Sequence, residues 1–262
     1  MTAGAQYDEV ARIYSLVDEW LSTTRPARHP SALLDLVDHV APPAGTVAAD
    51  LGGYDGRWAE LLEARFRCRV LPVDIAAVPL PMAQARGLSP VRADMQRLPF
   101  AAATLTLVWC RDALSMVPDP VSVVHEIARV LAAGGGAVIY TALTTPRLEP
   151  VERREFLAAL DAPSWWGEGR VPIDEAVASA GLEVVHEERF SPEHQEAALR
   201  EAAPEVLKDL VILARLHREH EALERLAPGP WTARVRAWSA WAPYLLLGKL
   251  ETRAWVLRKG RR

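Results

Sequence analysis

Residues 46–56 read TVAADLGGYDG, an apolar run that ends in an acidic residue and a glycine-rich turn. The apolar run Thr46–Leu51 is too short for a buried helix and is typical of a buried strand. Gly52 and Gly53 end the strand, and Arg57–Phe66 then has the spacing of an amphipathic helix. A buried strand, a glycine turn and a helix in this order predict the start of an α/β domain.

The same alternation continues along the chain. A helix is signalled by Asp119 as its N-cap and Pro120 in its first turn, and glycines 134–136 end it. Another helix is predicted over Pro172–Gly181. Strands that alternate with helices indicate a doubly wound α/β domain with a parallel sheet covered on both faces. The further strands are predicted at Val70–Ile75, Ser89–Ala93, Leu105–Cys110, Ala137–Leu143, Leu182–Phe190 and Ala254–Arg258.

Four regions follow from this pattern. Residues 1–45 carry two helical stretches, Asp8–Leu21 and one that follows Pro30, and are expected to form a helical cap. Residues 46–190 form the α/β domain. Residues 191–250 have a helical pattern and are predicted to be a lid over the site, and residues 251–262 hold the last strand and a tail.

Composition excludes several classes of protein. The 262 residues include 30 basic and 34 acidic side chains, so the formal charge of −4 provides no cationic field for nucleic acid or membranes. Two cysteines, Cys68 and Cys110, cannot form a disulfide framework and suit a reducing compartment. Met1–Glu9 lacks a signal-peptide pattern, and no apolar run approaches the ~20 residues of a membrane span. We therefore expect a cytoplasmic protein.

Acidic residues occur at three successive strand ends. Asp50 precedes the glycine turn, Asp74 closes the second strand, and Asp94 follows the third. Ligands of doubly wound sheets bind at the carboxyl ends of the strands, where the helix after the turn offers free N–H groups. The turn lacks the Gly-x-Gly-x-x-Gly pattern of nicotinamide sites. Asp74 could instead accept two ribose hydroxyls, and Asp94 with Met95 could meet an adenine ring.

At this point the sequence resembles the class I S-adenosylmethionine-dependent methyltransferases, in particular the small-molecule group. The resemblance covers roughly Tyr7–Tyr140, and its most specific stretch is Ala93–Phe100. It implies a Rossmann-like sheet of seven strands in the order 3-2-1-4-5-7-6, with strand seven antiparallel and residues 191–250 inserted between strands six and seven. The sequence resemblance itself continues through residues 107–112, 117–120, 125–131 and 134–136.

The resemblance also implies a cofactor, S-adenosyl-L-methionine, and a set of residues that bind it. Tyr54 departs from the family pattern, which has glycine at this position; its ring would crowd the cofactor or stack on it. The carried-over residues are Asp50, Gly52, Gly53 and Gly56 at the methionine part, Asp74 and Ile75 at the ribose and adenine, Asp94 and Met95 at the adenine, and Cys110 and Arg111 beneath the cofactor.

Methyl transfer needs two reactants held close together, and proximity alone contributes ~7–11 kcal/mol. A base helps where the nucleophile is a hydroxyl or an ammonium group. The candidates are Asp112, His29 and His194; the alternatives are an ion pair between Asp112 and Arg111, and ordinary surface histidines. Trp165 and Trp166 are predicted to form a substrate wall, with core packing as the alternative. No metal site is predicted.

The leading hypothesis is an S-adenosylmethionine-dependent methyltransferase that acts on a small, partly apolar metabolite by in-line transfer, as in secondary-metabolite biosynthesis. One alternative is a cyclase or isomerase that keeps the cofactor, and another is a non-catalytic binding protein. Nucleic acid is disfavoured as a substrate, because residues 110–113 read CRDA and lack the Asn/Asp-Pro-Pro-aromatic signature of base amino methylation. The apolar helices of residues 191–250 are compatible with a homodimer.

Overall fold

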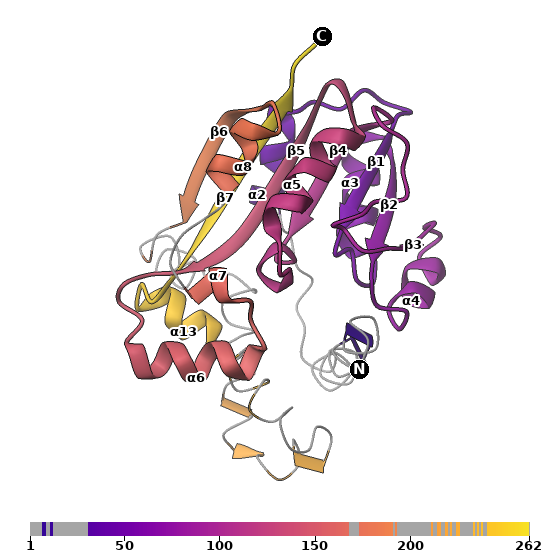
Figure 1. Ribbon diagram of the computed structural model, residues 1–262. Helices are drawn as coiled ribbons and strands as arrows, with labels where there is room; N and C mark the ends of the chain where they lie inside the picture. Colours follow the sequence, from indigo (N-terminus) through magenta and orange to yellow (C-terminus); the bar gives the residue numbers. More distant parts are fainter. Residues whose placement is uncertain are drawn as a thin grey trace.

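The computed structural model describes residues 7–8, 11–12, 31–167, 173–190, 192 and 240–261, together with single residues and pairs between 211 and 237. Its centre is a sheet in the order β3-β2-β1-β4-β5-β7-β6, which confirms the predicted Rossmann-like topology (Figure 1). Strands β1 to β5 pair in parallel, and β7 runs antiparallel to both β5 and β6. The strands are β1 (Val47–Leu51), β2 (Arg69–Asp74), β3 (Val91–Arg92), β4 (Leu105–Arg111), β5 (Leu131–Thr144), β6 (Leu182–Phe190) and β7 (Leu250–Lys259).

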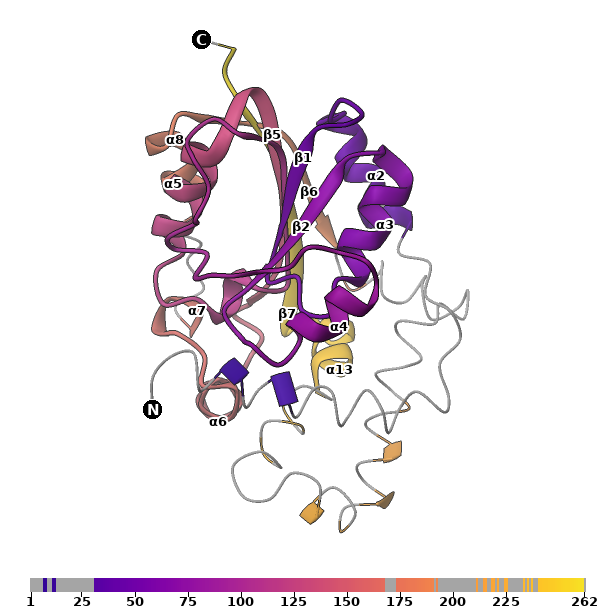
Figure 2. The same ribbon diagram turned by 90° about the vertical axis from the view of Figure 1, so that its right-hand side faces the viewer.

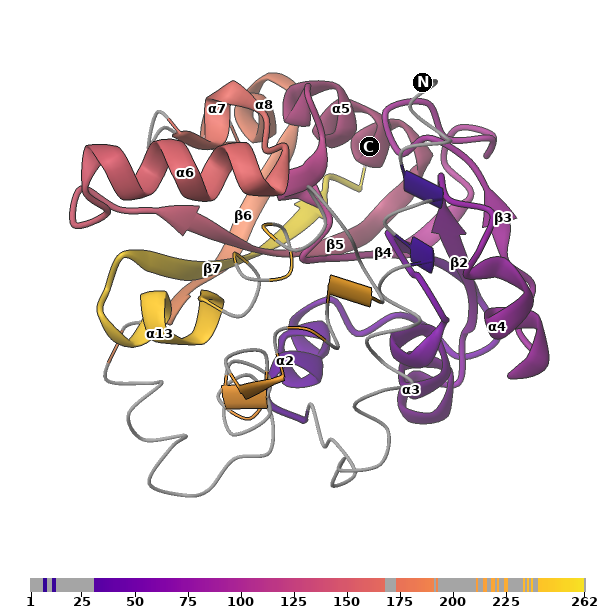
Figure 3. The ribbon, with the colours of Figure 1, turned by 90° about the horizontal axis from the view of Figure 1, so that it is seen from below.

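Helices cover both faces of the sheet. Figure 2 shows α2 (Ser31–Asp35) and α3 (Arg57–Phe66) on one face, and α5 (Pro120–Val130) and α8 (Ile173–Ser179) on the other. A third group lies beyond the carboxyl end of β5 (Figures 1 and 3). It consists of α6 (Pro150–Leu160), α7 (Ser164–Gly167) and α13 (Trp241–Leu246), while α4 (Leu80–Ala85) follows β2, η1 (Leu36–His39) follows α2, and η2 (Leu114–Met116) follows β4.

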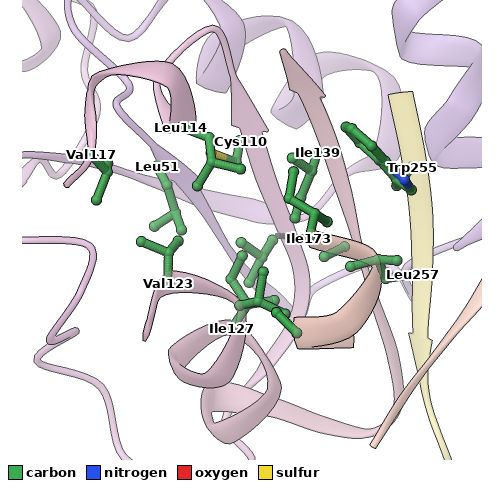
Figure 4. Packing of buried hydrophobic residues seen from close by; sticks show 14 of the residues in the cluster. Leu51, Cys110, Leu114, Val117, Val123, Ile127, Ile139, Ile173, Trp255 and Leu257 are labelled. Atoms are coloured by element: carbon green, nitrogen blue, oxygen red, sulfur yellow. The ribbon is translucent and has the colours of Figure 1, made fainter. Parts of the chain in front are cut away.

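The core has two layers, one on each face of the sheet. Along β4, Val108 and Cys110 point into the layer under α5, whereas Leu107 and Trp109 point into the layer under α3. Figure 4 shows the α5 layer, where Ile127 faces the side chains of the central strands. A central parallel strand is buried on both faces, which explains why β4 reads as a continuous apolar run rather than an alternating one.

The predicted elements differ from the observed ones mainly at their ends. β7 begins at Leu250 instead of Ala254, and β5 begins at Leu131 instead of Ala137. The predicted start of α5 is correct, since the Asp119 carboxylate accepts the Ser122 N–H at 3.1 Å. Its predicted end is wrong: the helix stops at Val130, and glycines 134–136 lie within β5. Helices α4 and α6 were not predicted. In the described part of the chain, no helix combines the length and apolar character that a bilayer crossing requires.

Candidate functional site

The carboxyl ends of β1, β2 and β4 lie side by side. Asp50 on β1 is in register with Pro72 on β2 and with Trp109 on β4. The next residue, Leu51, is in register with Val73 and Cys110. Strand pairing therefore brings the predicted site residues at the end of each of these strands to one edge of the sheet, which we call the cofactor edge.

The glycine turn packs tightly against the neighbouring strands. The N–H groups of Gly52 and Gly53 both donate to the Val73 carbonyl, at 2.8 and 3.1 Å. Gly52 has a φ of +71°, and a Cβ on this residue would lie 2.3 Å from the Ala113 Cβ. A Cβ on Gly53 would lie 2.9 Å from the Pro72 Cβ. Glycine is required at both positions because the backbone of the turn packs directly against Ala113 and Pro72, which leaves no room for a Cβ.

Asp50 is the most unusual residue of the cofactor edge. Its side chain is buried, with 3% of the residue exposed, and its Oδ2 has no hydrogen-bond partner. Burial, and after it the negative charge of Asp74, raise the pKa of the Asp50 carboxyl to about 7, while the charge of Arg111 acts in the opposite direction. A buried polar atom without a partner is costly, so this oxygen fits a site that a ligand completes.

Asp74 lies beside the turn and is held by backbone groups. Its Oδ2 accepts the Tyr54 N–H at 3.1 Å, and its Oδ1 accepts the Ala76 N–H at 2.9 Å. Burial raises the pKa of this carboxyl, and these two hydrogen bonds oppose the shift. Ile75, the next residue, is half-buried. Backbone donors thus orient the Asp74 carboxylate at the end of β2.

Asp94 and Met95 follow β3, as predicted. The Asp94 Oδ1 accepts the Gln96 N–H at 2.9 Å, so the carboxylate is anchored within its own turn. The Met95 Cε lies 3.7 Å from the position that a Cβ on Gly52 would occupy. The loop after β3 therefore reaches the glycine turn, and Asp94 and Met95 lie near Asp50 and Asp74 around one edge.

Tyr54 has a backbone conformation that L side chains rarely adopt, with φ of +46°. Its hydroxyl donates to the carbonyl of Ala11 at 3.4 Å. The N-terminal segment also contacts other strand ends. The Tyr7 hydroxyl donates to the Met116 carbonyl at 2.6 Å, and the Asp8 carboxylate accepts the Ala77 N–H. Tyr54 therefore links the glycine turn to a segment that crosses the cofactor edge.

The end of β4 carries a cysteine, an arginine and an aspartate in succession. Burial raises the pKa of the Cys110 thiol to about 12, so this group is a neutral, apolar surface. Arg111 and Asp112 form an ion pair with 3.0 Å between Nη2 and Oδ2. The ion pair that was the alternative for Asp112 is thus present, although 36% of the Asp112 side chain remains exposed.

The two adjacent tryptophans lie in different environments. Trp166 is 2% exposed, and its indole N–H donates to the Ala142 carbonyl at 2.7 Å. The prediction that Trp166 lines an open substrate wall is therefore wrong, because Trp166 is packed in the core. Trp165 is half-buried, and its indole N–H donates to the Val117 carbonyl at 2.8 Å, in the loop that follows Asp112.

Trp166 belongs to a group of four rings from three helices beyond β5, which we call the aromatic cluster. Its centroid lies 5.6 Å from that of Trp241 and 6.0 Å from that of Phe156. Phe156 also approaches Tyr244 at 5.1 Å. Tyr244 was not among the predicted site residues, although its spacing from Trp241 on one helix would have signalled a shared face.

The remaining candidates are His29 and His194, and both lie outside the described residues. Within the described residues, no group of three His, Cys, Asp or Glu side chains is arranged to hold a metal ion. The residues at the cofactor edge do fit S-adenosylmethionine. The cofactor is cationic at its sulfonium and amino groups, which suits the unpartnered Asp50 oxygen, and its ribose hydroxyls suit the oriented Asp74 carboxylate.

Comparison with known proteins points to the same chemistry. The family described as "Methyltransferase domain" matches residues 49–139. A ubiquinone biosynthesis O-methyltransferase from Albidiferax ferrireducens is 28% identical over 158 residues, covering 56% of this chain and 62% of that protein. A dimethylglycine N-methyltransferase from Parasynechococcus marenigrum is 31% identical over 174 residues, covering 60% of each. The chain thus spans about three fifths of these curated relatives.

Solved structures share the fold at low sequence identity. The [4+2]-cyclase SpnF has a TM-score of 0.69 at 16% identity, covering 98% of this chain and 94% of that one. Geranyl diphosphate C-methyltransferase from Streptomyces coelicolor, in complex with S-adenosyl-L-homocysteine, has a TM-score of 0.61 at 18% identity, covering 87% and 75%. The matched domain and the methyltransferase relatives thus support an S-adenosylmethionine-dependent methyltransferase, and the solved structures show that the chain shares the fold of such enzymes.

Proposed function

We propose that this protein transfers the methyl group of S-adenosylmethionine to a small, partly apolar metabolite, in the manner of a biosynthetic enzyme for secondary metabolites. The observation that carries the proposal is the cofactor edge. There, Asp50 is buried with an unpartnered oxygen, and Asp74 is oriented beside it by backbone donors. The relatives named as O- and N-methyltransferases of small molecules support it.

Three carboxylates and the glycine turn would hold the cofactor. Asp74 accepts the two ribose hydroxyls, and Asp94 with Met95 meets the adenine. Asp50 faces the methionine part, where its negative charge attracts the cationic groups. The turn at Gly52 and Gly53 lets the backbone approach the ligand, because neither residue can carry a Cβ without collision.

The bound cofactor supplies an electrophilic methyl group on a sulfonium. The task of the protein is then to hold the acceptor atom in line with that methyl group and to exclude water. Where the acceptor is a hydroxyl or ammonium group, Asp112 receives its proton, since the exposed part of this carboxylate lies at the end of β4. His29 and His194 remain candidates for the same step.

Trp165 would form the acceptor wall. Its indole N–H is anchored on the Val117 carbonyl, in the segment that follows Asp112 and η2, which ties the ring to the chain after the proposed proton acceptor. An aromatic surface favours an apolar or aromatic acceptor. Aromatic acceptors with a hydroxyl group therefore come first as substrates, and residues 191–250 would cover them as a lid.

Product analysis tests the proposal. The protein is incubated with S-adenosylmethionine and a panel that includes a catechol, dimethylglycine and metabolites made by the products of neighbouring genes. We expect S-adenosylhomocysteine to accumulate only when an acceptor is present, in equal amount with the methylated product. Conversion of an acceptor without S-adenosylhomocysteine would instead indicate a cyclase or isomerase that keeps the cofactor intact. Failure to bind the cofactor would indicate a binding protein.

A further inference from the structure

Arg111 is a cation with a nearly fixed position at the end of β4. Its Cζ lies 4.6 Å from the ring centroid of Trp58 and 5.9 Å from that of Tyr140. Trp58 is itself stacked on Trp109, with 5.3 Å between the ring centroids. Only 25% of the Arg111 side chain is exposed. Two aromatic rings therefore hold the guanidinium in place, through packing and cation–π attraction.

The ion pair with Asp112 does not engage all the donor groups of the Arg111 guanidinium. The Arg111 Nη2 lies 3.0 Å from the Asp112 Oδ2, whereas the Arg111 Nε is buried without a hydrogen-bond partner. Asp112 is held on its own side by its N–H, which donates to the Tyr140 carbonyl at 2.9 Å. Asp50 on β1 is in register with Trp109 on β4, and Arg111 lies two residues further along β4 on the same face of the sheet as Trp109. The guanidinium is therefore a diagonal neighbour of the Asp50 carboxylate, and its charge favours the ionised form of that carboxylate.

The elements packed around Asp50 present mostly negative or neutral groups. From β2 comes the carboxylate of Asp74, and from the turn before α3 that of Asp55. Asp55 is already paired with arginines at 2.5 and 3.3 Å. From β4 comes the neutral thiol of Cys110. In the part of the chain that the structure describes, Arg111 is the cation that counters the effects of burial and Asp74 on Asp50.

We propose that Arg111 is a positioning residue for the cofactor and acts through Asp50: its held positive charge keeps the Asp50 carboxylate available to the cationic groups of S-adenosylmethionine. The inference rests on the proposed function, because it requires the cofactor to bind at the glycine turn. A protonated Asp50 must lose its proton to the solvent when the cation binds. Arg111 also repels the cationic cofactor directly. If that repulsion were its whole effect, removing the Arg111 charge would strengthen cofactor binding instead of weakening it.

The test is calorimetric titration with S-adenosylmethionine between pH 6 and 9, in two buffers of different ionisation enthalpy. The two buffers reveal how many protons are released on binding. The variants are Arg111→Met, Arg111→Lys and Asp50→Asn. Arg189→Met is the matched control, since Arg189 pairs with Glu187 on the edge strand β6, away from the cofactor edge. The amino group of the ligand titrates equally in all variants, so variants are compared at the same pH.

We expect the Asp50 contribution in the natural protein to be about half a proton released near pH 7, and Asp50→Asn to lack it. Loss of a nearby opposite charge raises a carboxyl pKa by about one unit or more. Arg111→Met should therefore release more protons and bind about five- to tenfold more weakly between pH 6 and 7. Its affinity should converge on that of the natural protein at pH 9. Arg111→Lys and Arg189→Met should keep the natural profile.

Two results would overturn the inference: an Arg111→Met profile parallel to the natural one, or tighter binding by this variant at pH 7. If that variant does not fold, Arg111→Gln takes its place. Carbon-13 NMR titration of Asp50 in the protein without ligand gives an independent reading, with a midpoint near pH 7 that moves upward when Arg111 loses its charge. Absence of cofactor binding at every pH would refute the proposed function, while the NMR titration would still decide the coupling.

Discussion

The cofactor edge and the aromatic cluster lie at the same end of the sheet but are built in opposite ways. At the cofactor edge, Asp50 is buried with an unpartnered oxygen, and the turn beside it has positive φ at Gly52 and Tyr54. In the aromatic cluster, rings fill the space and the buried indole of Trp166 is hydrogen-bonded. The cofactor edge thus has a buried oxygen left without a partner, as a ligand site would, whereas the buried indole of the aromatic cluster is already hydrogen-bonded within the protein.

The largest effect should follow from emptying the aromatic cluster. Trp166→Ala removes a buried ring and leaves the Ala142 carbonyl without its indole donor, and such truncations cost about 3–5 kcal/mol. We expect a large fall in melting temperature by calorimetry. Trp165→Ala is the control, because the half-buried ring should cost less. Equal melting temperatures for the two variants would show that the cluster is not a packed core.

A second large effect should appear at the cofactor edge, as a pH dependence of stability. The pKa of the Asp50 carboxyl is raised from 3.8 to about 7 in the folded protein, so the unfolded chain releases this proton at lower pH than the folded one and stability falls as the pH rises from about 4 to about 7. Below pH 4 both states hold the proton and the penalty vanishes. Without cofactor, Asp50→Asn should be more stable than the natural protein at pH 8, by about 4 kcal/mol at most.

Urea unfolding of both proteins at pH 4 and pH 8 measures this difference. The natural protein should lose stability relative to Asp50→Asn between the two pH values. Asp119→Asn serves as the control, because the Asp119 carboxyl is exposed and its pKa is lowered by its bonds to Ser122. An equal gap at both pH values would mean that Asp50 does not titrate in this range.

A smaller effect should appear in the kinetics of the acceptor and not in the affinity for the cofactor. Trp165→Ala removes a wall that we assign to the acceptor, so KM for the acceptor should rise about tenfold, as expected for about 1.4 kcal/mol of lost contact. Cofactor affinity should stay within about threefold, because the residues assigned to it lie at the ends of β1 to β4. Loss of cofactor binding with unchanged acceptor kinetics would move Trp165 to the cofactor side.

The smallest effect should come from Tyr54. Tyr54→Phe removes the hydroxyl and with it the 3.4 Å hydrogen bond to Ala11, so cofactor affinity should change by about threefold or less. Tyr54→Gly also removes the ring and relieves the positive φ, and we expect its affinity to stay within about thirtyfold of the natural value. Calorimetry on both variants separates the hydroxyl from the ring. Complete loss of binding would show that the turn is organised differently.

The cofactor edge could be predicted from the sequence because its signals are local. An acidic residue at each strand end and a glycine turn lie within short segments, and parallel pairing then brings Asp50, Asp74 and Asp94 together. The helix after Asp119 was predicted for the same reason, since its N-cap contact spans only three residues. The tight packing of Gly52 against Ala113 gives the glycine pattern a structural reason beyond ligand approach.

The rest depends on contacts that no local pattern carries. β7 extends back to Leu250 although Arg253 interrupts its apolar pattern, because this arginine is buried against Glu187 of β6 and Asp174 of α8. The burial of Trp166 depends on Trp241, which lies beyond β6 in the chain. One missed element did have a local signal. Glu149 and Glu152 form a capping box, and Pro150, directly after Glu149, is the first residue of α6.

The most direct test of the cofactor edge is calorimetric titration of the natural protein and Asp74→Ala with S-adenosylmethionine at pH 8. The Asp74 carboxylate should accept two ribose hydroxyls, through charge-assisted bonds worth about 1.5–3 kcal/mol each in gross terms. We expect saturable binding of one cofactor per chain by the natural protein and at least tenfold weaker binding by Asp74→Ala, with an unchanged circular dichroism spectrum. Equal affinity of the two proteins, or no saturable binding by the natural one, would contradict the assignment of this edge to the cofactor.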